Sequence, residues 1–199
     1  MARTLVLGTR NVKKRQEIEE ILAGLGLELC DLSAWPDLPA VVEDGDTFEA
    51  NARKKAVETA VAVKRWVLAE DSGLVVPALS GRPGVLSARY AGKQGDDEAN
   101  NARLLKELAP LPDSSRAAYY VCTAVLSDPS GEVRAVTEGR CHGVIIREHR
   151  GSGGFGYDPL FLIPEYHRTF GELSPLVKHA LSHRARALAK LRPALWRIE

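Results

Sequence analysis

The chain has 199 residues, 45% of them hydrophobic, and a formal net charge of +1. This length and composition suit a globular fold with a sizeable core and exclude a disordered chain. The balanced charge argues against a basic nucleic-acid-binding tail or a polybasic membrane patch. No apolar run approaches the ~18 residues that a membrane span needs. We therefore expect a protein with no nucleic-acid partner and no membrane segment.

The first third of the chain alternates between apolar runs and amphipathic segments. The predicted elements are a strand at 3–8, a helix from Asn11 to the glycines at 24 and 26, a strand at 27–32, a helix at 47–65 and a strand at 66–73. The helices follow from apolar residues at three- and four-residue steps, and Thr47 is a suitable N-cap. This strand–helix order predicts an α/β fold with ligands at the strand ends.

The remainder predicts a helix, a long hairpin and a terminal helix. Residues 96–109 carry leucines on one helical face, and two β runs within 116–148 flank the turn signal DPSG at 128–131. From Ser174, an apolar stripe that begins with Ser-Pro predicts one terminal helix. We expect an α/β fold with an elongated mixed β-sheet flanked by helices, and two lobes with a central substrate cleft. The whole chain, residues 1–199, is expected to form a single domain.

The three cysteines, Cys30, Cys122 and Cys141, are odd in number and widely spaced. Each lies in an apolar, strand-like segment, and none forms the CxxC spacing of redox and zinc motifs. We therefore expect buried, reduced thiols and a cytoplasmic location, because reducing compartments keep thiols free.

Residues 151–161, GSGGFGYDPLF, contain the G-x-G-x-x-G pattern of dinucleotide-binding folds. That motif requires a helix directly after the glycines. Pro159 and Pro164 follow instead, and a proline inside a helix removes a hydrogen bond and clashes with the preceding turn. We interpret the glycines as a loop that lets the backbone approach a ligand closely.

Three further segments carry polar residues suited to chemistry. Residues 9–14, TRNVKK, precede a helix whose free N–H groups and dipole favour anions, so a phosphate site and an ordinary capped helix are both open. Glu70 and Asp71 suit a magnesium ion or a general base, although a polar turn also accounts for them. His179 and His183 are four residues apart but lack the glutamate of a zinc helix, so we expect no zinc there.

Five segments occur in the order TRNVKKRQEI, TFEANARKKA, AEDSGLVVPALSGRPGVLSARYAG, GSGGFGYDPLF and LSHRARAL. Together they make the full chain resemble the inosine triphosphate pyrophosphatase family, also called dITP/XTP pyrophosphatases. The resemblance implies Mg²⁺-dependent hydrolysis of ITP, dITP and XTP to the monophosphate and pyrophosphate, which clears deaminated purines from the nucleotide pool. It also implies a homodimer and an elongated α/β sandwich with a cleft.

The resemblance further implies roles for individual residues. Asp71 is the expected general base and, with Glu43, a metal ligand, while Asp44 and Glu70 are alternatives for the second metal ligand. The expected substrate-binding residues are Thr9, Arg10, Asn11, Val12, Lys13, Lys14, Lys55, Ser72, Phe155, Gly156, Tyr157, Asp158, Lys178, His183 and Arg184. Those up to residue 55 are expected to bind the phosphates, and those beyond residue 150 the purine.

Two other functions remain open from the sequence. A non-catalytic purine-nucleotide-binding protein would share the cleft but would need no general base. A pyrophosphatase for other modified nucleotides, such as pyrimidine or methylated ones, would need a different base pocket. Pyrophosphate release from ITP separates the first from an enzyme, and a substrate panel separates the second.

Overall fold

The computed structural model describes residues 3–198, which contain a mixed seven-stranded β-sheet in the order β2-β1-β3-β4-β5-β6-β7. The strands are β1 (Arg3–Leu7), β2 (Leu27–Asp31), β3 (Val67–Val75), β4 (Ala117–Ser127), β5 (Val133–Ile145), β6 (Phe161–Ile163) and β7 (Arg168–Thr169). β1 pairs in parallel with β2 and β3, whereas β6 pairs antiparallel with β5 and β7. The predicted α/β class with a mixed sheet is confirmed.

Five α-helices lie within the described residues: α1 (Val12–Leu22), α2 (Phe48–Val63), α3 (Asp97–Leu108), α4 (Pro175–Leu181) and α5 (His183–Leu195). The first three begin where the sequence predicts, because a polar side chain caps each one. Asn11 accepts a hydrogen bond from the Lys14 N–H, and Thr47 accepts one from the Ala50 N–H. Within residues 3–198, no helix is both long and apolar enough to cross a membrane.

The chain folds as two compact units. The first comprises the described residues up to Asp71, Cys122–Gly139 and the residues from His183 onward, and the second comprises Ser72–Val121 and Arg140–Ser182. Each of β3, β4 and β5 contributes residues to both units.

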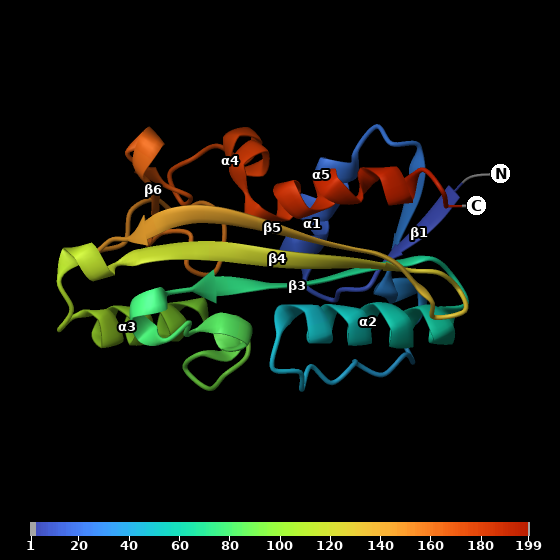
Figure 1. Ribbon diagram of the computed structural model, residues 1–199, viewed down its shortest axis with the longest axis horizontal. Helices are drawn as coiled ribbons and strands as arrows, with labels where there is room; N and C mark the ends of the chain where they lie inside the picture. Colours follow the sequence, from blue (N-terminus) through green and yellow to red (C-terminus); the bar gives the residue numbers. More distant parts are fainter. Residues whose placement is uncertain (1–2, 199) are drawn as a thin grey trace. The chain divides into compact units, whose positions relative to one another are not determined.

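The first unit is a three-layer sandwich, with α1 and α5 on one side of its strands and α2 on the other (Figure 1). Successive strand residues point to opposite faces, so β1 contributes side chains to two hydrophobic cores, one on each side of the sheet. Leu5 and Leu7 pack with buried residues of α1 and α5. Val6 packs with the alanines of α2, whose small side chains allow a close approach to the sheet.

The core of the second unit is rich in aromatic residues. Tyr120, Phe161 and Phe170 pack together, with ring centroids 4.7 Å apart for Tyr120–Phe161 and 5.2 Å apart for Phe161–Phe170. Leu104 and Leu108 of α3 are fully buried in the same cluster, as the predicted apolar face of this helix requires. The segment after the glycine-rich loop forms β6 and not a helix, which confirms the rejection of a dinucleotide motif.

The predicted terminal helix is wrong, because the chain forms two helices separated at Ser182. This residue is fully buried and has an extended backbone, with φ −64° and ψ 153°. Serine is favoured directly before a helix, a signal that the continuous apolar stripe concealed. Leu176, an apolar residue in the first turn of α4, is 82% exposed and does not belong to a buried stripe. His179 and His183 therefore lie on different helices and do not share a helical face.

Two further predictions need correction. The strand expected at 66–73 continues to Val75, because Leu74 is buried and extends its apolar run. Glu70 and Asp71 lie in the interior of this strand, so the alternative of a polar turn is wrong. The cysteines are free as expected. Cys30, however, is only half-buried, because β2 is an edge strand of the sheet.

Candidate active site

Strand β3 places two carboxylates on opposite faces of the sheet in the first unit. Glu70 and Asp71 are adjacent in the strand, and both are buried. Because neighbouring side chains alternate, Asp71 faces α2 while Glu70 faces α1 and α5. The two carboxylates therefore belong to two separate clusters.

The Asp71 cluster consists of Glu43, Asn51, Lys55 and Asp71. The Lys55 Nζ lies 2.7 Å from Glu43 Oε2 and 3.6 Å from Asp71 Oδ1. The Asn51 Nδ2 donates to Asp71 Oδ2 at 3.1 Å. Asn51 and Lys55 are four residues apart, so they share one face of α2. The helix thus presents an amide and a cation to the same carboxylate.

The electrostatics of this cluster suit a general base. Burial is the largest influence on Asp71 and raises the pKa of its carboxyl, and the Lys55 and Lys14 ammonium groups oppose that rise only in part. Burial lowers the pKa of Lys55, but the charges of Asp71 and Glu43 outweigh it, so the pKa of Lys55 is raised. A carboxylate with a raised pKa is a stronger proton acceptor, and Lys55 keeps its positive charge beside it.

The acidic segment before α2 contributes Glu43, not Asp44, to this cluster. The Asp44 side chain is 65% exposed and pairs with Lys54 at 2.7 Å. Its hydrogen bond from Lys54 lowers the pKa of Asp44, which is the opposite of the shift at Asp71. Glu70 faces the other side of the sheet, so Glu43 is the carboxylate that meets Asp71 around Lys55.

The Glu70 cluster is a buried network of charges. Glu70 Oε1 lies 3.1 Å from both Lys14 Nζ and Arg184 Nη2, and the Cys122 thiol contacts Oε2 at 3.5 Å. The Arg184 Nη1 donates to Glu17. Burial opposes the charge of Arg184, but Glu70 and Glu17 outweigh it and raise the pKa of the guanidinium. The network thus holds two cations between two carboxylates.

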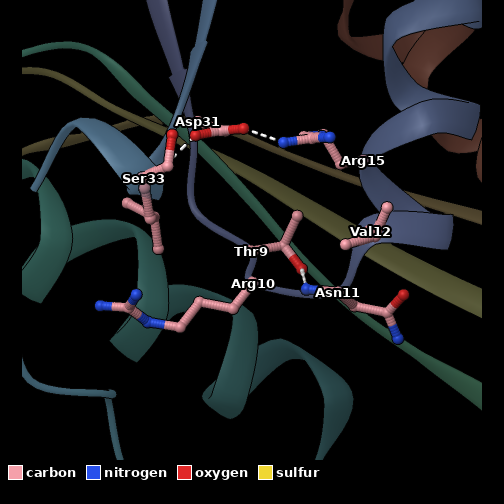
Figure 2. A pocket seen from close by; sticks show the side chains of 8 residues that line it. Thr9, Arg10, Asn11, Val12, Arg15, Asp31 and Ser33 are labelled. Carbon is pink, nitrogen blue, oxygen red and sulfur yellow. Dashed lines mark hydrogen bonds and ion pairs between the residues drawn. The ribbon is translucent and has the colours of Figure 1, made fainter. Parts of the chain in front are cut away.

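The loop between β1 and α1, which contains Thr9, Arg10 and Asn11, lines a cavity of about 200 Å³ (Figure 2). Its lining consists of Thr9, Arg10, Asn11, Val12, Arg15, Asp31, Leu32 and Ser33. The Thr9 Oγ1 accepts a hydrogen bond from the Asn11 N–H at 3.2 Å. Figure 2 also shows the ion pair between Arg15 and Asp31. Four of the predicted phosphate-binding residues, 9–12, therefore share one hollow. Lys14 is directed to Glu70, and Lys13 is exposed.

The second unit gathers five of the residues predicted to bind the purine. The Lys178 Nζ lies 2.7 Å from Asp158 Oδ2 and 4.8 Å from the Phe155 ring centroid. Asp158 Oδ2 also accepts from the Phe155 N–H at 2.9 Å. Gly156 donates its N–H to Asp97, and the Tyr157 hydroxyl donates to the Ser87 carbonyl.

The glycine-rich loop owes part of its conformation to a steric requirement at Gly154. This residue has φ +74°, and a Cβ added there would lie 2.1 Å from Asp158 Oδ2. Glycine lets the loop close over the carboxylate that binds Lys178. Of the other predicted substrate residues, Ser72 lies in β3 within the second unit, whereas His183 and Arg184 belong to the first.

Comparison with known proteins shows to which protein family the chain belongs. The model of the Ham1 family matches residues 5–194. The chain belongs to the Ham1 family. This Ham1-family chain is 57% identical over 194 residues to a dITP/XTP pyrophosphatase from Rhodopirellula baltica, an alignment that covers 98% of the chain and 93% of that protein. It is 52% identical to a dITP/XTP pyrophosphatase from Geobacter sulfurreducens, with 96% of each chain covered.

Solved structures agree with the Ham1-family assignment. A HAM1 protein from Coxiella burnetii matches with a TM-score of 0.88 at 37% identity, over 97% of this chain and 98% of that chain. A nucleoside-triphosphatase / dITP/XTP pyrophosphatase from Mycobacterium abscessus matches with a TM-score of 0.78 at 45% identity, over 96% and 99% of the two chains. The family resemblance identified from the sequence is confirmed.

The Asp71 cluster of this Ham1-family protein offers carboxylate oxygens, the type of ligand that hard divalent cations take in proteins. Among residues 3–198, no group of three or more His, Cys, Asp and Glu side chains is placed to hold a metal ion. Glu43 and Asp71 instead offer two carboxylates that share the Lys55 ammonium. Mg²⁺ prefers oxygen ligands and keeps several waters, so one or two protein carboxylates suffice.

Sequence reasoning missed Glu17 and Asn51. Both are buried polar residues on otherwise apolar helix faces. Glu17 is followed by the buried Ile18, and Asn51 lies one turn before Lys55. A charged or amide side chain on a buried helix face is the signal that could have identified them, because such groups need polar partners.

Proposed function

We propose that this chain hydrolyses the deaminated purine nucleoside triphosphates ITP, dITP and XTP to the monophosphate and pyrophosphate. The observation that carries this proposal is the Asp71 cluster, in which a buried carboxylate with a raised pKa meets Glu43 and Lys55. The proposal is supported by relatives that are dITP/XTP pyrophosphatases at 57% and 52% identity. In a cell, this activity would remove aberrant purines from the nucleotide pool.

In the proposed mechanism, water attacks the α-phosphorus and Asp71 accepts its proton, while the bond from the α-phosphorus to the α–β bridging oxygen breaks and pyrophosphate leaves. Lys14, Lys55 and the N-terminus of α1 stabilise the negative charge of the phosphates, with residues 9–13 holding them in place. Glu43 and Asp71 would hold Mg²⁺, which when bound neutralises charge on the phosphate oxygens. The protein contributes mainly positioning and charge stabilisation, as is general in phosphoryl-transfer enzymes.

For the purine, we propose that Phe155 stacks on the ring and that Lys178, His183 and Arg184 donate hydrogen bonds. Position 6 of inosine and xanthine carries a carbonyl acceptor, whereas adenine carries an amino donor. Lysine and arginine only donate, so they favour the carbonyl over the amino group. Ser72, Gly156, Tyr157 and Asp158 are assigned to the substrate on the family resemblance.

We also propose that residues 1–199 act as a single pyrophosphatase domain that works as a homodimer in the cytoplasm, without a nucleic-acid partner. The balanced charge of the chain supports the absence of a nucleic-acid partner, and its three free cysteines support the cytoplasmic location. The single domain and the homodimer rest on the family resemblance. The proposed substrate is a free nucleotide.

Pyrophosphate release from a panel of nucleotides with Mg²⁺ tests the proposed function. We expect ITP, dITP and XTP to exceed ATP in kcat/KM by about a hundredfold or more, since each donor buried against a donor costs ~1–3 kcal/mol. Equal hydrolysis of ATP and ITP would contradict the proposal. Binding of ITP without pyrophosphate release would support a non-catalytic nucleotide-binding protein. Release from pyrimidine or methylated nucleotides alone would support the other alternative.

A further inference from the structure

Asn51 makes two hydrogen bonds that join separate parts of the Asp71 cluster. The side chain belongs to α2 and is 1% exposed. Its Nδ2 donates to Asp71 Oδ2 at 3.1 Å, and its Oδ1 accepts from the Gly45 N–H at 2.8 Å. One amide therefore links the acidic segment before α2, the helix itself and strand β3.

An amide at this position satisfies the chemistry of both partners. The Asp71 carboxylate needs a donor, and the Gly45 N–H needs an acceptor. A primary amide supplies one of each at adjacent atoms, whereas an ionised carboxylate only accepts and an ammonium only donates. The amide is also neutral, so it holds Asp71 without placing another full charge beside it.

Asn51 and Lys55 together define the orientation of the Asp71 carboxylate. Lys55 approaches Oδ1 and Asn51 approaches Oδ2. With a different partner at each oxygen, rotation of the carboxylate about its Cβ–Cγ bond would break both contacts. A proton acceptor must be held in a defined geometry, because a misplacement of about 1 Å costs roughly 10²-fold in rate.

The Gly45 contact fixes the acidic segment against α2. A Cβ added to Gly45 would lie 2.8 Å from Asn51 Oδ1 and 2.9 Å from the Ala50 Cβ, so the backbone packs tightly on the helix there. Glu43 lies two residues earlier and reaches Lys55 from this same segment. Movement of Gly45 would therefore be transmitted both to Asn51 and to Glu43.

We propose that Asn51 is a positioning residue. It orients Asp71 as the proton acceptor, and it holds the acidic segment that contains Glu43 in a fixed position relative to Asp71. This inference rests on the proposed pyrophosphatase function. Asn51 acts through Asp71 and Gly45, so its loss is expected to reduce kcat with little change in KM.

Asn100 offers a matched control within the same chain. Each asparagine is the fourth residue of its helix, donates its backbone N–H to the capping residue and is buried. The Asn100 Oδ1 accepts from the Ala91 N–H at 2.7 Å, just as Asn51 accepts from Gly45. Its partners, Ala88 and Ala91, are not among the residues that we assign to the substrate.

The test compares Asn51→Leu, Asn100→Leu and Gly45→Ala with the wild type in steady-state ITP hydrolysis and thermal unfolding. We expect both leucine variants to lower Tm similarly, because each leaves buried polar groups without a partner. Of the two leucine variants, only Asn51→Leu should lower kcat, by about 10–100-fold with KM nearly unchanged. Gly45→Ala keeps the amide but displaces it, and should lower kcat in the same direction.

Three results would overturn the inference: a wild-type kcat in Asn51→Leu, an equal loss of kcat in Asn100→Leu, or a loss confined to KM. If Asn51→Leu does not fold, Gly45→Ala decides, and an unchanged kcat in that variant rejects the positioning role. The wild-type rate in the same assay tests the proposed function separately. An inactive wild type rejects both proposals, whereas an active wild type with an unimpaired Asn51→Leu rejects only this one.

Discussion

Replacing Asp71 with asparagine is expected to lower kcat for ITP hydrolysis by about 10²–10⁴-fold, the usual contribution of a positioned general base. Asparagine keeps the shape of the side chain, and its amide oxygen still accepts from Asn51. It has no basic oxygen to receive a proton and removes one negative charge beside Glu43 and Lys55. Steady-state kinetics with pyrophosphate detection measures the change.

Asp44→Asn provides the control, since Asp44 is exposed and pairs with Lys54 outside the cluster. Its kcat should equal that of the wild type. If Asp71→Asn instead retained wild-type kcat, the proton acceptor would lie elsewhere, and Glu70→Gln would be the next variant to measure.

The same Asp71→Asn variant should be at least as stable as the wild type without added metal. Burial raises the pKa of Asp71 in the folded state, so the ionised carboxylate reduces the free energy of unfolding at neutral pH. That reduction disappears as the pH falls below the pKa of the unfolded side chain, about 3.9. Any gain in Tm from asparagine should therefore be largest near pH 7 and shrink as the pH is lowered.

Replacing Arg184 with alanine is expected to reduce the free energy of unfolding by about 3–5 kcal/mol, as when one partner of a buried ion pair is removed. Arg184 is 1% exposed and binds both Glu17 and Glu70. Glu70 retains Lys14, but Glu17 loses its contact with the guanidinium and a large cavity is left. Chemical denaturation measures the difference.

Arg192, an exposed arginine of the same helix, is the matched control. Arg192→Ala should change the free energy of unfolding by less than about 0.5 kcal/mol. A loss below about 1 kcal/mol in Arg184→Ala would mean that the buried network contributes no more than a surface ion pair. At temperatures where Arg184→Ala stays folded, kcat/KM for ITP and for ATP can also be compared. A smaller ratio of the two values than in the wild type would support the proposed contact of Arg184 with the purine.

The helices α1, α2 and α3 could be predicted because their signals are local. Asn11 and Thr47 cap the first two, and apolar residues follow the helical period in all three. The break at Ser182 was missed, because the apolar stripe runs across this buried serine and conceals its preference for the position before a helix. Strand β3 likewise continues through two charged residues only because other elements supply their partners.

The site could be predicted from the sequence only where local motifs carry it. Residues 9–14 and the Glu70–Asp71 pair stand out because in both places polar residues follow a run of apolar residues. The grouping of Glu43 with Asp71 through Lys55 came from the family resemblance, and its geometry appears only in the fold. The Glu17–Arg184 contact joins residues 167 positions apart, which no local pattern reveals.

Hydrolysis of ITP in water labelled with oxygen-18 tests the central claim most directly. Attack on the α-phosphorus, with Asp71 as proton acceptor, predicts IMP that carries the label and unlabelled pyrophosphate in equal amounts. Mass spectrometry of both products distinguishes the possible sites of attack. Label in the pyrophosphate would place the attack on the β-phosphorus, and IDP with labelled orthophosphate would place it on the γ-phosphorus; either result would contradict the proposed reaction.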